Sequence, residues 1–309
     1  MRFFSDANYR FIEKRRVAYV VSGAAILAGI LAMVFNVFTL GSWQNYGVDF
    51  TGGTLVQVRV ERESDIQAMR QALSAGGIGA FSLQAFGEEG SKEYLITLAQ
   101  ASDDAAVAGR GPAARVEQTL KEQFPQVQIR RVESVGPKVG AELKEAASEA
   151  ILFSLVAILI YIWVRFQWRY SIGAIVATAH DVLVVMACFV FTQREISLTV
   201  VAAVLTVAGY SVNDTIVIYD RIRENLRKFR KKVITDTIND SINQTLSRTV
   251  LTAGTTLFVV AAIYVFGGEI INDFAFALLV GIVVGTYSSV FVAAPLVYML
   301  LQRFPPKLR

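Results

Sequence analysis

The chain has 309 residues, of which 54% are hydrophobic, and it carries a formal net charge of +4 and a single histidine. Its apolar residues gather into runs of about 20, the length that crosses roughly 30 Å of hydrocarbon, which excludes a soluble globular protein. The basic residues flank these runs, so the positive charge indicates membrane topology rather than nucleic-acid binding.

Six apolar runs predict six transmembrane helices. The first is too long for the apolar core of a cleaved signal peptide and is interpreted as an uncleaved anchor. Basic residues concentrate at one set of helix ends, which by the positive-inside rule places both termini in the cytoplasm. The six runs are Val17–Leu40, Ala150–Val164, Ile172–Phe191, Ser197–Tyr219, Val250–Phe266 and Phe274–Leu301.

Residues 41–149 are polar and are expected to form a separate extracytoplasmic domain, between a membrane anchor at 1–40 and the remaining helices at 150–309. Their pattern alternates in the order β-α-β-β-α-β, which is typical of a small α+β ferredoxin-like domain. The expected strands are 54–61, 80–86, 94–99 and 127–135, and the expected helices are 65–74 and 112–124.

The stretch 221–247 is too polar to span a membrane. Its apolar residues recur mostly every three to five positions, which suits an amphipathic helix lying on the membrane surface, in contact with membrane lipids. A solvated basic loop on the cytoplasmic side explains the same composition equally well.

Asp214 is the most informative residue, because it lies inside the fourth apolar run. An ionisable group there costs about 3 kcal/mol on insertion scales and commonly marks an ion or proton site. Ser211 and Thr215 lie four residues apart on one helix face beside Asp214, and Asn213 adjoins it. This stripe predicts a proton relay, although sodium binding and a structural hydrogen-bonded clamp between helices are alternatives.

Two further sites accompany Asp214. Arg248 opens the fifth run and is either its charge partner or a snorkelling side chain at the interface. His180 and Asp181 lie near the middle of the third run, where they either carry protons or hold helices together. Gly281 and Gly285 form a small-xxx-small pair that permits close helix contact.

The sequence favours no enzymatic activity and implies no cofactor or metal. It contains no phosphate-binding loop and no cluster of metal ligands, and its only histidine lies inside an apolar run. A six-helix unit with one large external loop is half of a two-part transporter. This sequence holds no second copy of that unit, so another polypeptide is expected to supply the other half.

Six motifs resemble the SecF branch of the SecD/SecF family, which belongs to the bacterial Sec translocon. The resemblance covers nearly the whole chain, with Ala253 a small departure where the family often has serine. The motifs are GVDFTGG at 47–53, SVGPKVG at 134–140, AHDV at 179–182, GYSVNDTIVIYDRIREN at 209–225, QTLSRT at 244–249 and GTYSSVFVAAPL at 285–296.

The resemblance implies one half of an RND-type (resistance-nodulation-division) transporter in the bacterial inner membrane. Its partners would be a SecD-like subunit, the SecYEG channel and the translocating preprotein, and the proton motive force would assist export. The resemblance assigns proton coupling to Asp214, with Arg248 as its partner. A lipid or small-molecule exporter half and a non-transporting assembly factor are the rival hypotheses.

Overall fold

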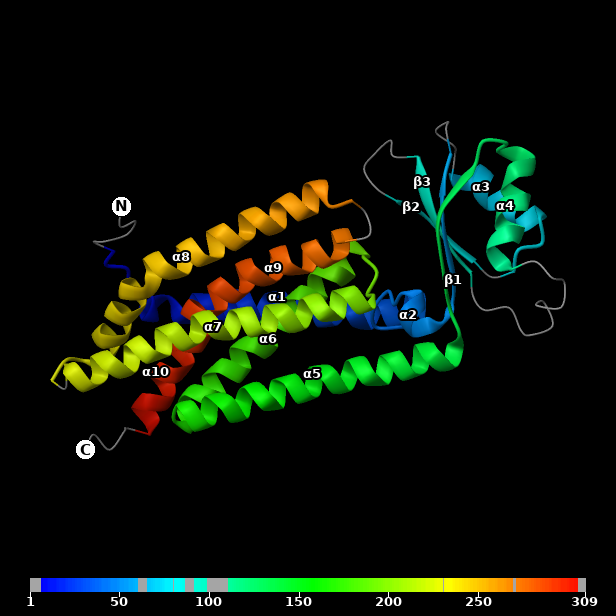
Figure 1. Ribbon diagram of the computed structural model, residues 1–309. Helices are drawn as coiled ribbons and strands as arrows, with labels where there is room; N and C mark the ends of the chain where they lie inside the picture. Colours follow the sequence, from blue (N-terminus) through cyan, green and yellow to red (C-terminus); the bar gives the residue numbers. More distant parts are fainter. Residues whose placement is uncertain are drawn as a thin grey trace. The chain divides into compact units, whose positions relative to one another are not determined.

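The computed structural model describes residues 7–60, 66–79, 81–86, 92–98, 111–229, 231–268 and 271–304 (Figure 1). It divides into two compact units, one formed by Met1–Asn45 with Glu149–Arg309 and the other by Tyr46–Ser148. The first unit is a helical bundle, and the second is an α+β domain.

Six helices among the described residues are long and apolar enough to cross a membrane, which confirms the predicted number. The last of them, the sixth span, has a π-helical segment near its middle. The spans are α1 (Arg15–Leu40, preceded by the 3-10 turn η1, Ile12–Lys14), α5 (Pro137–Arg165), α6 (Trp168–Thr192), α7 (Leu198–Lys228), α8 (Ile234–Phe266) and the sixth span α9–η4–α10 (Asn272–Ser288, Ser289–Ala293, Ala294–Arg303).

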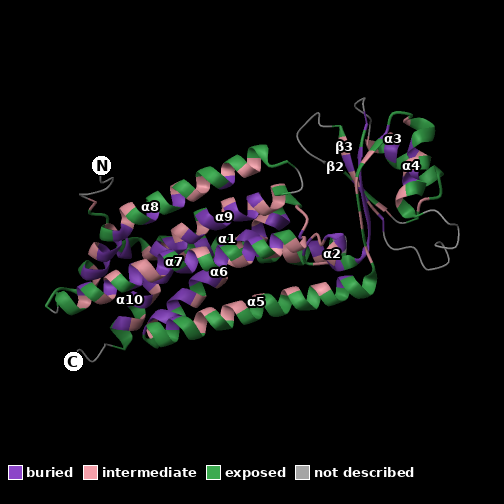
Figure 2. Cartoon of the chain, viewed as in Figure 1, coloured by how far each residue is buried: buried purple, intermediate pink, exposed green. Residues whose placement is uncertain are grey.

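Three spans form the centre of the bundle. Half of the apolar window of α6, half of that of α7 and 56% of that of the sixth span are buried, against 6% in α5. Figure 2 shows the same contrast, with buried residues gathered on the central helices and exposed ones along α5. An apolar helix surface that packs on no protein suits contact with lipid, so α5 fits a peripheral position.

The π-helical segment of the sixth span has a local cause. Pro295 lacks an amide hydrogen, and its ring clashes with the carbonyl group four residues earlier, on Phe291. The helix widens over Ser289–Ala293, directly before this proline. On α7, the Tyr219 hydroxyl donates a hydrogen bond to the Ala293 carbonyl oxygen at 3.3 Å. Segments of this kind are frequent at functional sites and helix hinges.

The α+β unit has the predicted element order. Its four strands form one antiparallel sheet in the order β2-β3-β1-β4, the arrangement of a ferredoxin-like domain. Its core is made by apolar residues such as Val56 and Ile96, together with Leu73 of α3 and Leu120 of α4. The elements are α2 (Val48–Thr51), β1 (Gly53–Arg59), α3 (Ile66–Ala75), β2 (Phe81–Phe86), β3 (Glu93–Leu98), α4 (Pro112–Gln123) and β4 (Gln128–Val135).

Two of the short motifs meet inside this unit. Gly52 adopts a φ of +69°, a conformation that favours glycine, and ends the short helix α2. A Cβ atom on Gly140 would lie 3.1 Å from the Gly52 nitrogen. The segments 47–53 and 134–140 therefore pack backbone against backbone, which explains why both are rich in glycine.

The structure corrects both interpretations of residues 221–247. Most of the described residues in this stretch belong to two long helices rather than to a separate surface helix or a single loop, because Lys228 ends α7 and Ile234 begins α8. Three of the periodic apolar residues, Ile222, Ile238 and Ile242, are fully buried in the bundle core. The periodicity thus reflects packing of the extended helices on each other rather than on a lipid surface.

The N-terminal segment is held against the extended part of α8 by two asparagines. The Asn239 side-chain oxygen accepts a hydrogen bond from the buried Ile12 amide at 3.0 Å, and its nitrogen donates to Glu13. One turn later, Asn243 exchanges two hydrogen bonds with the backbone of Tyr9, at 3.0 and 2.9 Å. These side-chain amides therefore satisfy backbone hydrogen-bonding groups of the N-terminal segment, as a neighbouring strand would in a β-sheet.

Replacement of Asn239 by alanine is expected to destabilise the chain by about 1–3 kcal/mol, because it leaves the buried Ile12 amide without its acceptor. Asp240→Ala on the same turn is the matched control. It removes only the half-exposed ion pair with Lys232, and we expect a cost of about 0–1 kcal/mol. Thermal unfolding in one detergent compares the two, and equal shifts would contradict the prediction.

Candidate functional site

Asp214 lies on α7, about 24 Å along the helix from its start at a rise of about 1.5 Å per residue. Only 4% of its surface is exposed. Its Oδ2 atom is buried and has no hydrogen-bond partner among the described residues. A buried carboxylate oxygen without a donor is costly as an anion, which makes it a favourable place to bind a proton or a cation.

The neighbours of Asp214 divide between two helix faces. Ser211 and Thr215 are buried on the same side of α7, as their spacing predicts. Asn213 is exposed, because a rotation of about 100° per residue turns it away. The structure therefore places Asn213 apart from the buried polar groups, and its contribution to the coupling site stays a prediction.

Arg248 lies on α8, which packs against α7. It is about 27 Å from the end of α8 at Phe266, which corresponds to nearly the same level as Asp214. Its side chain is exposed, and among the described residues no ion pair within 4 Å joins it to Asp214. The structure brings the two residues to one level on neighbouring helices without a direct contact.

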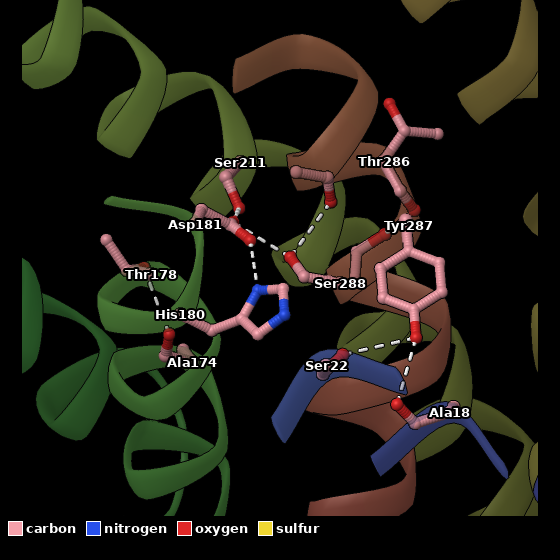
Figure 3. Close-up of polar contacts among 12 residues, drawn as sticks. Ala18, Ser22, Ala174, Thr178, His180, Asp181, Ser211, Thr286, Tyr287 and Ser288 are labelled. Carbon is pink, nitrogen blue, oxygen red and sulfur yellow. Dashed lines mark hydrogen bonds and ion pairs between the residues drawn. The ribbon is translucent and has the colours of Figure 1, made fainter. Parts of the chain in front are cut away.

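Asp181 is the centre of a polar cluster between α6, α7 and α9 (Figure 3). It has no exposed surface. Its Oδ1 atom lies 2.9 Å from His180 Nδ1, and its Oδ2 atom accepts hydrogen bonds from Ser211 at 2.5 Å and Ser288 at 2.8 Å. The Asp181 carboxylate thus links α6 to α7 and α9. Its partner on α7, Ser211, lies one helical turn before Asp214.

The cluster continues toward α1 through Tyr287 (Figure 3). Its ring centroid is 6.2 Å from that of His180, and its hydroxyl donates to the Ala18 carbonyl oxygen at 3.2 Å. The Ser22 hydroxyl lies 3.2 Å from the same Tyr287 oxygen. The sequence analysis assigned no individual role to Tyr287 or Ser288, because nothing local links them to Asp181.

A second polar network lies at the start of α7, where the 193–197 loop connects α6 to α7. Arg194 forms an ion pair with Asp273, donates to Asn272 at 2.8 Å and to the Tyr264 hydroxyl at 3.1 Å. Its guanidinium carbon lies 4.4 Å from the Phe276 ring centroid. The loop is therefore fixed to α8 and α9 by one arginine, which stabilises this end of the bundle.

The outer surfaces of α7 and α8 carry polar side chains at the level of the apolar core. Thr206 and Asn213 are exposed on one side of α7, and Arg248, Thr252 and Thr255 are exposed at helical spacing on α8. The threonines bond to their own helix, whereas an amide and a guanidinium facing lipid are expensive. This polar stripe of five residues favours contact with another polypeptide.

Two family models match the chain. The model for the protein export membrane protein SecD/SecF, C-terminal, matches residues 115–303, and the SecD/SecF GG motif matches residues 45–63. The chain belongs to the SecD/SecF family. The second match falls on the glycine-rich turn that ends α2, and the first includes His180, Asp181, Asp214 and Arg248.

Curated relatives extend the similarity over almost the whole chain. The protein translocase subunit SecF of Vibrio alginolyticus is 46% identical, covering 94% of this chain and 90% of the relative. That of Rickettsia bellii is 42% identical, covering 94% and 92%. Both are full-length matches, so the family assignment includes both units.

A solved structure of SecDF, a translocon-associated membrane protein from Thermus, and a structure of SecDF in a super-membrane-facing form both resemble nearly the whole chain. One covers 98% of this chain with a TM-score of 0.83 and 36% identity, and a super-membrane-facing form has a TM-score of 0.68. The chain spans only 40% of the SecDF chain. It therefore shares the RND-like transporter fold with part of that protein.

Proposed function

We propose that this protein acts as a SecF-like subunit that assists protein export across the bacterial inner membrane together with a SecD-like subunit. The relatives that match it from end to end are named protein translocase subunits, which favours transport over catalysis. The observation that carries the coupling part is the buried, unpartnered Oδ2 atom of Asp214. We infer that this carboxylate takes up and releases the ion that drives the cycle.

The coupling step requires two conformations with different proton affinity. In one, Arg248 approaches Asp214 and stabilises its anion; in the other, Arg248 stays at the exposed face of α8 and the buried acid favours its protonated form. The shared level of the two residues supports this exchange. Sodium is the alternative ion, and a sodium gradient that stimulates export in place of a proton gradient would identify it.

The SecD-like half would cover the polar stripe on α7 and α8. This chain matches 40% of the SecDF chain that it resembles, which supports a SecD-like partner as the counterpart of the remaining part. A protein partner also removes the cost of Asn213 and Arg248 in lipid. Contacts with a SecYEG channel and with the preprotein belong to the same proposal.

The orientation follows from charge. Basic residues gather where α7 meets α8, among them Arg221, Arg223 and Arg227, and the positive-inside rule assigns this end to the cytoplasm with both termini. The α+β unit is then periplasmic and acts on the preprotein there. The two solved SecDF structures match this chain with TM-scores of 0.83 and 0.68, so they differ from each other over the shared region, which supports a moving domain.

Depletion of the chain in its host tests the export function. We expect precursors of secreted proteins to accumulate, and we expect the tagged chain to copurify with a SecD-like subunit. Accumulation of a lipid or drug with normal precursor processing would instead identify an exporter half. Normal processing in a strain that carries Asp214→Asn, together with a defect in the depleted strain, would leave only an assembly role.

A further inference from the structure

The pair His180 and Asp181 lies outside the coupling step described above, yet both side chains are buried in the bundle. Asp181 has no exposed surface, and 6% of His180 is exposed. Two serine hydroxyls and the imidazole surround the carboxylate, all within 3 Å. A single hydrogen bond would be enough to hold two helices together here. Three hydrogen-bonding groups from three helices around one carboxylate indicate a built site.

The charges around the pair leave it one possible counterion. Among the described residues, the neighbouring helices carry Tyr287 on α9, Tyr19 on α1, and Tyr210 and Asp214 on α7 as titratable groups near this level, and none of them is a cation. No lysine or arginine occurs within 17–40, 170–193, 198–219 or 271–302. A buried carboxylate without a counterion is strongly disfavoured. His180 is therefore the group that neutralises Asp181, either as imidazolium or by sharing one proton with it.

We propose that His180 and Asp181 form a second proton-binding site, and that its charge state is transmitted to α7 and the sixth span through Ser211 and Ser288. The proton comes from water and returns to water through the imidazole or the carboxylate, and the serines keep their own. The link to transport rests on the proposed function, whereas proton binding by the pair does not.

Ser288 gives this site a means of transmission. Its hydroxyl donates to Asp181 Oδ2 at 2.8 Å, but the Gly285 carbonyl oxygen lies 3.2 Å from the same hydroxyl. One hydroxyl hydrogen serves one strong acceptor at a time. An ionised Asp181 holds it, and a protonated Asp181 releases it to the backbone. Ser288 directly precedes the π-helical segment, so the exchange acts on the most adaptable part of the sixth span.

Ser211 connects the same carboxylate to α7. It is three residues before Asp214, about 4.5 Å along the helix axis. Loss of charge on Asp181 weakens the hydrogen bond that fixes this turn of α7 to α6. The second site thus sets how firmly the helix that carries Asp214 is held, which makes Asp181 a positioning residue for the coupling acid as well as a proton acceptor.

Infrared difference spectra between acidic and alkaline pH test proton binding directly. The full chain with its SecD-like partner in lipid nanodiscs should show a carboxylic-acid band that persists in Asp214→Asn and disappears in Asp181→Asn. His180→Gln should shift the midpoint of that band by about one pH unit or more. Thr178→Val is the control, because it removes a buried hydrogen bond within α6 to Ala174 and spares the pair.

The outcomes separate this site from packing and from the proposed function. Asparagine at position 181 matches aspartate in size and resembles its uncharged form, so Asp181→Asn should fold normally while the pH profile of export shifts or flattens. The inference is overturned if Asp181→Asn leaves both the carboxylic-acid band and the pH profile of export unchanged. It is also overturned if His180→Gln does not shift the midpoint of that band. Export that survives Asp214→Asn while the Asp181 band persists rejects the proposed coupling and supports the second site.

Discussion

Replacement of Asp214 by asparagine is expected to abolish stimulation of preprotein export by the proton motive force, while the chain stays folded and assembled. Asparagine has the same shape as aspartate and cannot exchange a proton. The Oδ2 atom of Asp214 has no hydrogen-bond partner among the described residues, so nothing that the structure records there is lost. Removal of a buried, unpartnered charge should leave stability equal or higher, by about 1 kcal/mol.

Asp220→Asn is the matched control, because it makes the same chemical change on the same helix at an exposed position. Asp220 lies 3.8 Å from Arg165, and both side chains are more than half exposed. We expect about the wild-type stimulation, since a surface ion pair contributes little. The measurement is translocation of a preprotein into inverted vesicles with and without a proton gradient. Equal losses in both variants would contradict a special role of Asp214.

Arg248 provides an independent check of the same step. Arg248→Gln should keep assembly and lower stimulated export strongly, because the Asp214 anion then lacks its partner in one of the two conformations. Arg248→Lys keeps the charge and should retain part of the activity. Wild-type stimulation in Arg248→Gln would return this residue to a purely interfacial role. The vesicle assay used for Asp214 measures all three proteins.

Local patterns explain how much of the fold was readable from the sequence. Apolar runs and strand alternation depend on neighbouring residues, which is why the six spans and the β-α-β-β-α-β order were correct. The stretch 221–247 was misread because a helix that extends beyond the membrane and packs on protein has the same periodicity as one that lies on lipid. Only the burial of residues such as Ile238 separates the two cases.

The candidate site was readable only in part. Asp214 stands out because a charge inside an apolar run is unusual. The bond between Asp181 and Ser288 joins residues 107 positions apart, and that between Ile12 and Asn239 joins residues 227 apart. Contacts of this kind depend on which helices become neighbours, which no local pattern encodes. The role of Arg248 stays a prediction, because its exposure reflects a face that another polypeptide is expected to cover.

Replacement of Gly281 by alanine is expected to destabilise the bundle by about 1–3 kcal/mol through overpacking between α7 and α9. The added Cβ atom would lie 2.2 and 2.6 Å from the two γ-carbons of Val207 and 2.9 Å from its β-carbon. Valine is stiff about its first side-chain torsion and cannot turn all three atoms away. The helices must therefore separate, and Ser211, one turn along α7, is drawn away from Asp181.

Gly23→Ala on α1 and the double variant Gly281→Ala/Val207→Ala separate this clash from a general effect of glycine loss. A Cβ atom at Gly23 meets nothing within 4 Å, so alanine there should be neutral or stabilising by up to about 1 kcal/mol. The double variant removes both crowding γ-carbons and should recover part of the lost stability, which a double-mutant cycle reports as favourable coupling. Thermal unfolding of the wild type, the single variants Gly281→Ala, Val207→Ala and Gly23→Ala, and the double variant in the same lipid measures these shifts. A Cβ atom on Gly285 would likewise lie 2.9 Å from the Ser211 β-carbon, so both α9 glycines permit close approach to α7. Additive losses in the cycle, without coupling, would contradict the view that Gly281 sets the distance between α7 and α9.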